Sequence, residues 1–181
     1  KIRTPSYALP YAGLRVLDLS QGIAGPYCGM LLAQYGADVV KVEPASGDWG
    51  RSLGKRIGDH SAIDLTVNRG KRSIALDLKA PKDRQVFEKL VAKADLLVEN
   101  YRPGTMDKLG YGWAQLHALN PRLIFAAVSG FGQTGPYKGR AAYDMVVQLP
   151  VPSVEGMRAV ARGYAAVGLR ARIALTLADR T

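Results

Sequence analysis

Four short segments of the 181-residue chain combine polar or aromatic side chains with glycines, which let a backbone approach a ligand closely. These segments are 20–26 (SQGIAGP), the stretch that begins at Glu43 and Pro44, 100–104 (NYRPG) and 130–136 (GFGQTGP). Near them lie cations that could neutralise phosphate oxygens, namely Arg51, Arg72, Lys79, Arg102 and Lys108. One such loop alone is as readily a plain turn, and one such cation a solvated charge, but the four loops together favour a binding site.

The first segment invites comparison with a dinucleotide-binding turn, because Glu43 ends a predicted strand about 20 residues after Gly22. The glycine spacing does not fit that motif. Gly22 and Gly25 are separated by two residues, the third glycine is missing, and Pro26 lacks the N–H that a pyrophosphate would need. A nicotinamide site is therefore disfavoured, and Glu43 is interpreted as a carboxylate solvated at a strand end.

Signatures of other enzyme classes are weak. His60 and His117 lack the paired spacing of a metal site, and the sequence has neither a Gly-x-Ser-x-Gly elbow nor a Walker lysine loop. Cys28 is the only cysteine, so no internal disulfide and no cysteine-based metal cluster can form. In its apolar segment Cys28 is typical of core filling. Hydrolase, kinase and metalloenzyme functions all lose support, and we expect no metal.

The formal net charge of +10 is large for the length of the chain, but it is not concentrated. No basic run exceeds the pairs Lys55-Arg56 and Lys71-Arg72, and aromatic residues are not interleaved with the cations as they are on a nucleic-acid platform. Apolar blocks such as 124–128 are far shorter than the roughly 18 residues of a membrane span. We expect a cytoplasmic protein that binds an anionic small molecule, with no nucleic-acid or membrane partner.

The elements that must position the loops alternate between strands and helices. Short β-branched or apolar runs predict strands at 14–19, 37–43, 73–78, 95–99 and 123–128. Helical periodicity and end signals, such as Pro26 before and Gly36 after the first helix, predict helices at 27–35, 81–94 and 113–119. Residues 44–70 form a long functional loop with one helical turn near 62–67. The fold class is α/β, a mostly parallel sheet with helices on both faces, which places ligands at the carboxyl ends of the strands.

Six motifs, met in order between about Pro10 and Gln148, resemble those of the class III CoA-transferases. That family includes formyl-CoA, carnitine-type and succinyl-CoA-dependent transferases and the related α-methylacyl-CoA racemases. The motifs are 17–19 (LDL) with 24–26 (AGP), 36–43 (GADVVKVE), 68–79 (NRGKRSIALDLK), 98–104 (VENYRPG), 120–124 (NPRLI) and 130–136 (GFGQTGP). Their joint occurrence is highly specific.

The resemblance implies a fold and a set of partners. Residues 1–148 would be the N-terminal part of a Rossmann-like large domain that is incomplete here. Residues 149–181 depart from the family pattern, and we expect an atypical, helical tail there. Two chains would interlock as a homodimer. The substrates would be an acyl-CoA and a carboxylic acid acceptor, with no metal and no cofactor other than the CoA that the substrate carries.

The resemblance also assigns CoA contacts by position. The matching residues are Leu76, Asp77, Leu78, Lys79, Asn100, Tyr101, Arg102, Lys108, Tyr143 and Asp144. This assignment agrees with the composition of the loops, because the adenosine-phosphate end of CoA needs cations and the pantetheine needs an apolar, glycine-lined backbone.

In the family an aspartate attacks the thioester, and acyl group and CoA are exchanged through an anhydride and an aspartyl-CoA thioester. That aspartate lies in a Gly-Asp pair beyond a Tyr-Asp-x-x-x-Gln motif, which is 143–148 (YDMVVQ) here. No Gly-Asp pair follows Gln148, and neither Glu155 nor Asp179 has the family context. The catalytic residue therefore stays unassigned, and this stretch of chain could be inactive.

Two alternatives to the transferase remain. A non-catalytic CoA-binding or subunit-interaction module would fit the missing nucleophile. A racemase would need a base at the position that Tyr143 occupies, and a tyrosine with a pKa of about 10 removes an α-proton poorly. The sequence favours a CoA-transferase and leaves its acyl donor and acceptor open.

Overall fold

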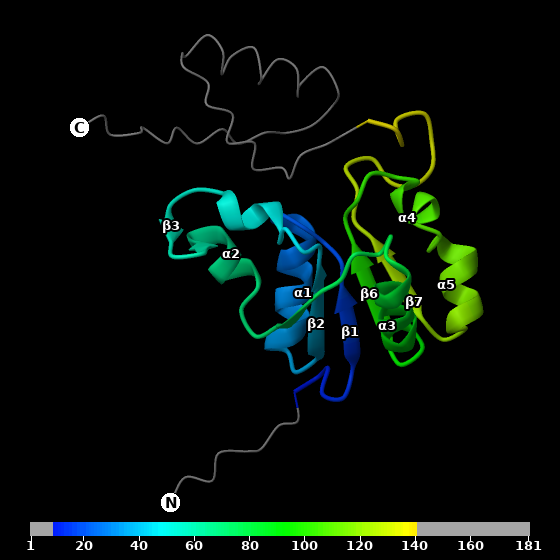
Figure 1. Ribbon diagram of the computed structural model, residues 1–181, viewed down its shortest axis with the longest axis horizontal. Coiled ribbons are helices and arrows are strands. Elements are labelled where there is room, and N and C mark those ends of the chain that lie inside the picture. Colours follow the sequence, from blue (N-terminus) through cyan, green and yellow to red (C-terminus); the bar gives the residue numbers. More distant parts are fainter. Residues whose placement is uncertain (1–8, 141–181) are drawn as a thin grey trace, which may run out of the picture. The chain divides into compact units, whose positions relative to one another are not determined.

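The computed structural model describes residues 9–140 (Figure 1). The chain divides into two units, Lys1–Met145 and Val146–Thr181, and the described residues all belong to the first. The boundary expected between residues 148 and 149 lies outside the described range.

The first unit is built on a five-stranded sheet in which every strand pairs in parallel with its neighbours. The strands are β1 (Arg15–Asp18), β2 (Asp38–Glu43), β5 (Arg72–Ala75), β6 (Leu96–Glu99) and β7 (Ile124–Ala127), in the order β5-β2-β1-β6-β7. The predicted parallel sheet is confirmed, and its order is that of a doubly wound fold. Strand β5 ends at Ala75, so residues 76–78 belong to the loop beyond it.

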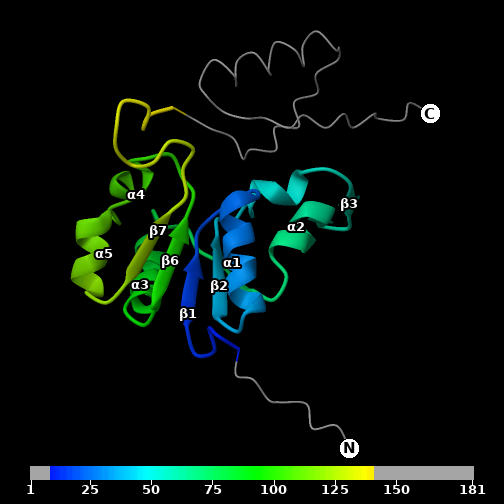
Figure 2. The same ribbon diagram turned by 180° about the vertical axis from the view of Figure 1, so that it is seen from behind.

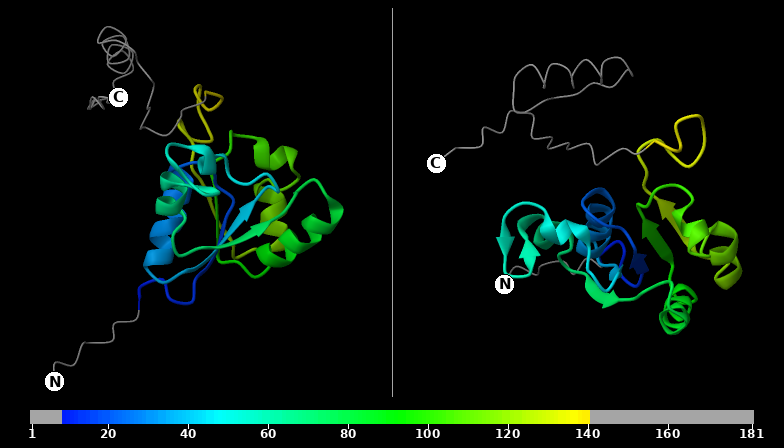
Figure 3. Two further views of the ribbon diagram at one scale, coloured as in Figure 1. Left: turned by 60° about the vertical axis from the view of Figure 1, so that its left-hand side comes forward. Right: turned by 45° about the horizontal axis from the view of Figure 1, so that its top comes forward.

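Helices cover both faces of the sheet (Figure 3). They are α1 (Ala24–Gln34), α3 (Pro81–Val91), α4 (Thr105–Lys108) and α5 (Trp113–Leu119). Because side chains alternate along a strand, Val16 of β1 packs in the apolar cluster that includes Cys28 of α1, whereas Leu17 packs in the other cluster with Phe87 of α3 and Leu116 of α5. Among residues 9–140, no helix is long and apolar enough to cross a membrane.

The predicted long loop carries secondary structure of its own. It contains the 3-10 helix η1 (Trp49–Ser52), a hairpin of β3 (Arg56–Ile57) and β4 (His60–Ser61), and α2 (Ala62–Val67). Helix α2 coincides with the predicted helical turn. It begins after Ser61 because the Ser61 hydroxyl caps it by accepting from the backbone N–H of Asp64 at 3.0 Å. Figures 1 and 2 show α2 beside α1, on the same side of the sheet.

Candidate functional site

The loops that follow β1 and β6 leave the sheet in opposite directions, since β1 leads through α1 to β2 and β6 leads through α4 and α5 to β7. Such a switch point is where open parallel sheets bind ligands. Asn100 joins the two loops there. Its Oδ1 accepts from the backbone N–H of Gln21 at 2.8 Å, and its Nδ2 donates to the Gln21 carbonyl at 2.7 Å. The structure thus brings together two of the segments selected from sequence.

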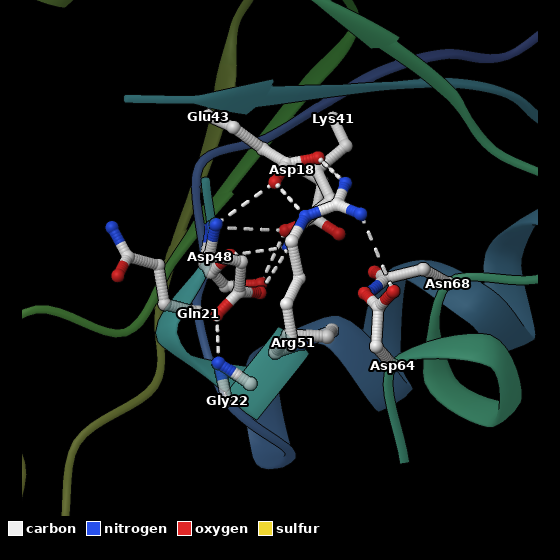
Figure 4. A network of polar contacts seen from close by, with 12 residues as sticks. Asp18, Gln21, Gly22, Lys41, Glu43, Asp48, Arg51, Asp64 and Asn68 are labelled. Atoms are coloured by element: carbon white, nitrogen blue, oxygen red, sulfur yellow. Dashed lines mark hydrogen bonds and ion pairs between the residues drawn. The ribbon is translucent and has the colours of Figure 1, made fainter. Parts of the chain in front are cut away.

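A buried ion pair fixes the loop after β1 to the loop after β2 (Figure 4). Lys41 Nζ lies 2.8 Å from Asp48 Oδ2 and donates to the Ser20 carbonyl at 2.8 Å. Asp48 Oδ1 accepts from the backbone N–H groups of Gly22 at 2.9 Å and Gly50 at 2.8 Å. Both charged side chains are excluded from solvent, and the pair therefore positions the backbone of the two loops.

A second buried lysine ties the segment before β5 to β1 and α1. Lys71 Nζ donates to Asp18 Oδ2, to Asn68 Oδ1 and to the Pro26 carbonyl, each at 2.7 Å. Burial lowers the pKa of Lys71, and the neighbouring Asp18 carboxylate opposes that shift. Gly29 of α1 leaves the necessary room, because a Cβ there would collide with Asp18.

Glu43 is buried and saturated with donors, so the sequence-based interpretation of a solvated strand-end carboxylate is wrong. Arg51 donates to it twice, from Nε at 2.9 Å and from Nη2 at 2.7 Å, and the Asp48 backbone N–H and the Ser73 hydroxyl donate as well. Burial would raise the pKa of Glu43, but these bonds outweigh burial and lower the pKa to about 2. Arg51 also reaches Asp64 at 3.4 Å, so its charge is fully used.

Glu99, at the end of β6, has the opposite environment. It is buried, it accepts from the backbone N–H of Tyr101 at 2.7 Å, and within residues 9–140 no cation pairs with it. Burial raises its pKa to about 7, although the Tyr101 hydrogen bond opposes the shift. A neutral, protonated carboxyl is therefore accessible near neutral pH beside the Asn100 loop.

The first group of predicted CoA residues lies in the loop between β5 and α3. Leu76 and Leu78 are buried in the core, 6% and 8% exposed, so only their backbone is available to a ligand. Asp77 is exposed, and its carboxylate accepts from the backbone N–H of Lys79 at 2.9 Å. The Lys79 side chain is exposed.

The second group follows β6. Tyr101 is half-buried, whereas Arg102 and Lys108 are exposed. Across residues 9–140, neither of these two cations nor Lys79 has a carboxylate within ion-pair distance. The remaining predicted contacts, Tyr143 and Asp144, lie outside the described residues.

Arg84 of α3 holds the two groups together, and sequence reasoning missed it. Its Nη1 donates to the Leu78 carbonyl at 3.2 Å and to the Leu109 carbonyl, just after α4, at 2.7 Å. The guanidinium also stacks 4.4 Å from the Tyr111 ring. No sequence signal separates Arg84 from the other surface cations of α3. Its role depends on how α3 and α4 pack.

A pocket of ≈ 540 Å³ opens beside Gln21. It is lined by Gln21, Pro44, Ser46, Gly47, Asp48, Trp49, Arg51, Ser52, Arg56 and Asp59. Gln21 therefore belongs both to the pocket and to the link with the predicted CoA loop. In the part of the chain that the structure describes, no three His, Cys, Asp or Glu side chains gather as a metal site would require.

The fold and the loops at its switch point define a class of α/β proteins that bind a small molecule at the carboxyl edge of the sheet. Comparison with known proteins narrows this class. The sequence model of CoA-transferase family III matches residues 11–163, and the chain belongs to that family.

Solved structures agree with this assignment. A CAIB/BAIF family protein from Brucella suis is 33% identical with a TM-score of 0.72, and the match covers 90% of this chain and 52% of that one. Rv3272 from Mycobacterium tuberculosis is 37% identical with a TM-score of 0.70, covering 82% of this chain and 42% of that one. The α/β fold expected from sequence is therefore that of the family.

Curated relatives carry names of CoA-transferases. The acetyl-CoA:oxalate CoA-transferase of Acetobacter aceti is 49% identical over 140 residues, which are 77% of this chain and 36% of that protein. The succinyl-CoA–D-citramalate CoA-transferase of Chloroflexus aurantiacus is 43% identical, and the match covers 83% of this chain and 37% of that protein. The succinate–glutarate CoA-transferase of Agrobacterium fabrum is 41% identical, and the match covers 80% of this chain and 38% of that protein. The chain thus spans little more than a third of the length of these relatives.

Proposed function

We propose that this protein is a CoA-transferase that moves CoA from an acyl-CoA to a carboxylic acid. The observation that carries the proposal is a group of exposed cations, Lys79, Arg102 and Lys108, which have no ion-pair partner among residues 9–140. They lie in the loop after β5, in the loop after β6 and at the end of α4, and Arg84 joins these segments at the carboxyl side of the sheet. CoA carries several phosphate charges at one end, and exposed cations without a protein partner suit such a ligand.

The CoA site follows from this arrangement. Lys79, Arg102 and Lys108 would contact phosphate oxygens, while the backbone of residues 76–78 would face the pantetheine, because the Leu76 and Leu78 side chains are committed to the core. Asn100 and Tyr101 would lie where the thioester approaches Gln21. Asp77, Tyr143 and Asp144 complete the proposed set of contacts.

Most of the acids in the names of these relatives are of one chemical class, although the acetyl donor named for the Acetobacter aceti enzyme is monocarboxylic. Oxalate, citramalate, glutarate and succinate, which appear in the names of the relatives, each carry two carboxylates. We propose a dicarboxylic acid as substrate for this protein as well. The second carboxylate then requires a polar or cationic environment on the acyl side of the site.

The proposed chemistry proceeds through an aspartyl-CoA thioester. An aspartate carboxylate attacks the thioester carbon, the C–S bond breaks, and a mixed anhydride and CoA thiolate form. The thiolate attacks the aspartyl carbonyl and releases the first acid as carboxylate. The acceptor carboxylate repeats both steps in reverse, which regenerates the aspartate. No aspartate of residues 9–140 is assigned this role, since the buried ones are committed to structural contacts.

We further propose that the protein works in the cytoplasm as an interlocked homodimer, with no metal and no cofactor besides the CoA of the substrate. Resemblance to the family supports this assembly. It would bring residues of two chains to one site.

Calorimetric titration with CoA and with NAD tests the binding part of the proposal. We expect CoA to bind more tightly than NAD, and equal or stronger NAD binding would contradict it. Trapping with an acyl-CoA, followed by peptide mass spectrometry, tests the chemistry: a covalent CoA adduct on an aspartate is expected. Tight CoA binding without any adduct would instead identify a non-catalytic CoA-binding module.

A further inference from the structure

The pocket between the β1 loop and the β3–β4 hairpin contains a cation that the structure leaves unused. Arg51 lines the pocket, but its guanidinium is ion-paired with Glu43 and Asp64. Arg56 of β3 lines the same pocket, is exposed, and has no ion-pair or hydrogen-bond partner for its side chain among residues 9–140. Its guanidinium is therefore the positive charge in this pocket that is available to a ligand.

The backbone that carries Arg56 is held firmly to the rest of the site. Arg56 pairs with Ser61 across the hairpin, and the buried Ser61 hydroxyl donates to the Gly50 carbonyl of η1 at 2.8 Å. Gly50 is in turn bound to Asp48 at 2.8 Å. The position of Arg56 relative to the pocket is thus fixed by the same network that fixes the β1 loop.

Two apolar residues of the pocket lining, Trp49 and Pro44, offer contact to a short carbon chain. The half-exposed Trp49 indole lies against Gly22, where any Cβ would collide with it, and Pro44 lines the pocket as well. Gln21, which also lines the pocket, is hydrogen-bonded through its backbone to Asn100, beside the proposed thioester position. The same pocket therefore contains Gln21, the apolar surfaces of Trp49 and Pro44, and the Arg56 guanidinium.

We propose that Arg56 binds the distal carboxylate of a dicarboxylic acyl group, so that this pocket selects dicarboxylic over monocarboxylic acids. The inference rests on the proposed function, and it assigns a residue to the substrate class. A planar guanidinium with two parallel N–H donors matches a carboxylate and rejects a methyl terminus. Asp59, which lines the same pocket, would repel the distal carboxylate and limit the affinity.

The experiment compares succinyl-CoA with butyryl-CoA, which has the same number of acyl carbons but no distal carboxylate, by calorimetric titration of the 181-residue chain. We expect wild type to prefer succinyl-CoA. Arg56→Gln should weaken the binding of succinyl-CoA about tenfold, as the loss of a hydrogen bond to a charged group predicts. It should leave the affinity for butyryl-CoA unchanged. Arg56→Lys should restore part of the preference, and Asp59→Asn should increase it.

Lys55→Gln is the matched control, because it removes the same charge one residue away and Lys55 does not line the pocket. It should leave both affinities unchanged. If CoA and butyryl-CoA bind but Arg56→Gln leaves the succinyl preference intact, or Lys55→Gln removes it equally, the inference is wrong while the proposed function stands. If CoA itself does not bind, the proposed function fails and this inference fails with it.

Discussion

Two regions at the carboxyl edge of one sheet use the same residue types in opposite ways. In the paired region, made of Asp18, Lys41, Glu43, Asp48, Arg51, Asp64 and Lys71, each charge meets a buried or half-buried partner. In the open region, made of Lys79, Arg102 and Lys108, the cations are exposed and have no carboxylate partner within residues 9–140. A cation near a loop is therefore available to a ligand only when no carboxylate of the protein pairs with it.

The five cations selected from sequence differ in whether a carboxylate pairs with them. Arg51 is bound by Glu43, and Arg72 by Asp38 at 2.7 Å. The other three belong to the open region. A buried ion pair must recover a large desolvation cost and is strongly destabilising to break, whereas an exposed cation can be removed at little cost to folding. Stability and ligand affinity should therefore respond to different variants.

The largest effect is expected in the paired region. Asp48→Asn keeps an oxygen for the Gly22 and Gly50 N–H groups but leaves Lys41 buried without a counter-charge. The free energy of unfolding should fall by about 3–5 kcal/mol, as is typical when one partner of a buried pair is removed. Urea denaturation followed by circular dichroism measures this change.

Asp38→Asn is the control for that experiment, because its pair with Arg72 is exposed, with side chains 52% and 69% accessible. It should lower stability by less than about 1 kcal/mol. Equal losses in the two variants would show that burial does not distinguish the pairs.

The next effect concerns pH and Glu99. Its pKa is raised from 4.5 to about 7 in the folded protein, so the stability linked to it is fully present below pH 4.5 and is lost as pH rises to about 7. Glu99→Gln cannot ionise and should lose this dependence. The stability difference between variant and wild type should therefore shift by about 3 kcal/mol in favour of the variant between pH 4.5 and 8.

Denaturation of both proteins at several pH values gives the answer, and other titrating groups cancel in the difference. Parallel stability profiles would contradict this prediction, because they would mean that the pKa of Glu99 is the same in the folded and the unfolded protein. Glu43 gives the opposite sign, since its pKa of about 2 lies below 4.5 and its contribution is lost only as pH falls through that window.

Most of the fold could be predicted from local patterns. Within residues 9–140, each predicted strand and helix exists, with ends shifted by a few residues: the first helix begins at Ala24 instead of residue 27, and β5 ends at Ala75 instead of residue 78. The helical tail predicted for 149–181 lies outside the described residues. Helix α4 and the β3–β4 hairpin were missed because they are too short for a periodic signal.

The pairing of charges could not be predicted. Lys41 within the apolar run of β2 is the one visible hint, since a lysine in a buried parallel strand needs a partner. Its partner Asp48, and the Lys71–Asp18 pair that spans 53 residues, depend on how loops fold over the sheet. Sequence spacing carries no information about such contacts. The 100–104 loop was selected from its composition and residues 76–79 from the family resemblance, but their link through Arg84 was not predicted.

A smaller effect is expected in the open region. Arg102→Gln and Lys108→Gln should each weaken CoA binding about fivefold, because solvent screens exposed ion pairs, and should leave the unfolding free energy unchanged. Lys89→Gln provides the control, since Lys89 is an exposed cation in the last turn of α3, at the end of the helix away from the loop after β5. Calorimetry measures the CoA affinity and denaturation the free energy of unfolding, on the same samples. A loss of stability with unchanged CoA affinity would reverse the roles given to the two regions.

The most direct test of the account is hydrogen–deuterium exchange of the chain with and without CoA. We expect CoA to slow exchange in residues 76–79 and 100–108, the segments that carry the exposed cations. Exchange in the buried network around Lys41 and Asp48 should stay unchanged. Protection confined to the paired region, or none in the two open loops at saturating CoA, would contradict this expectation.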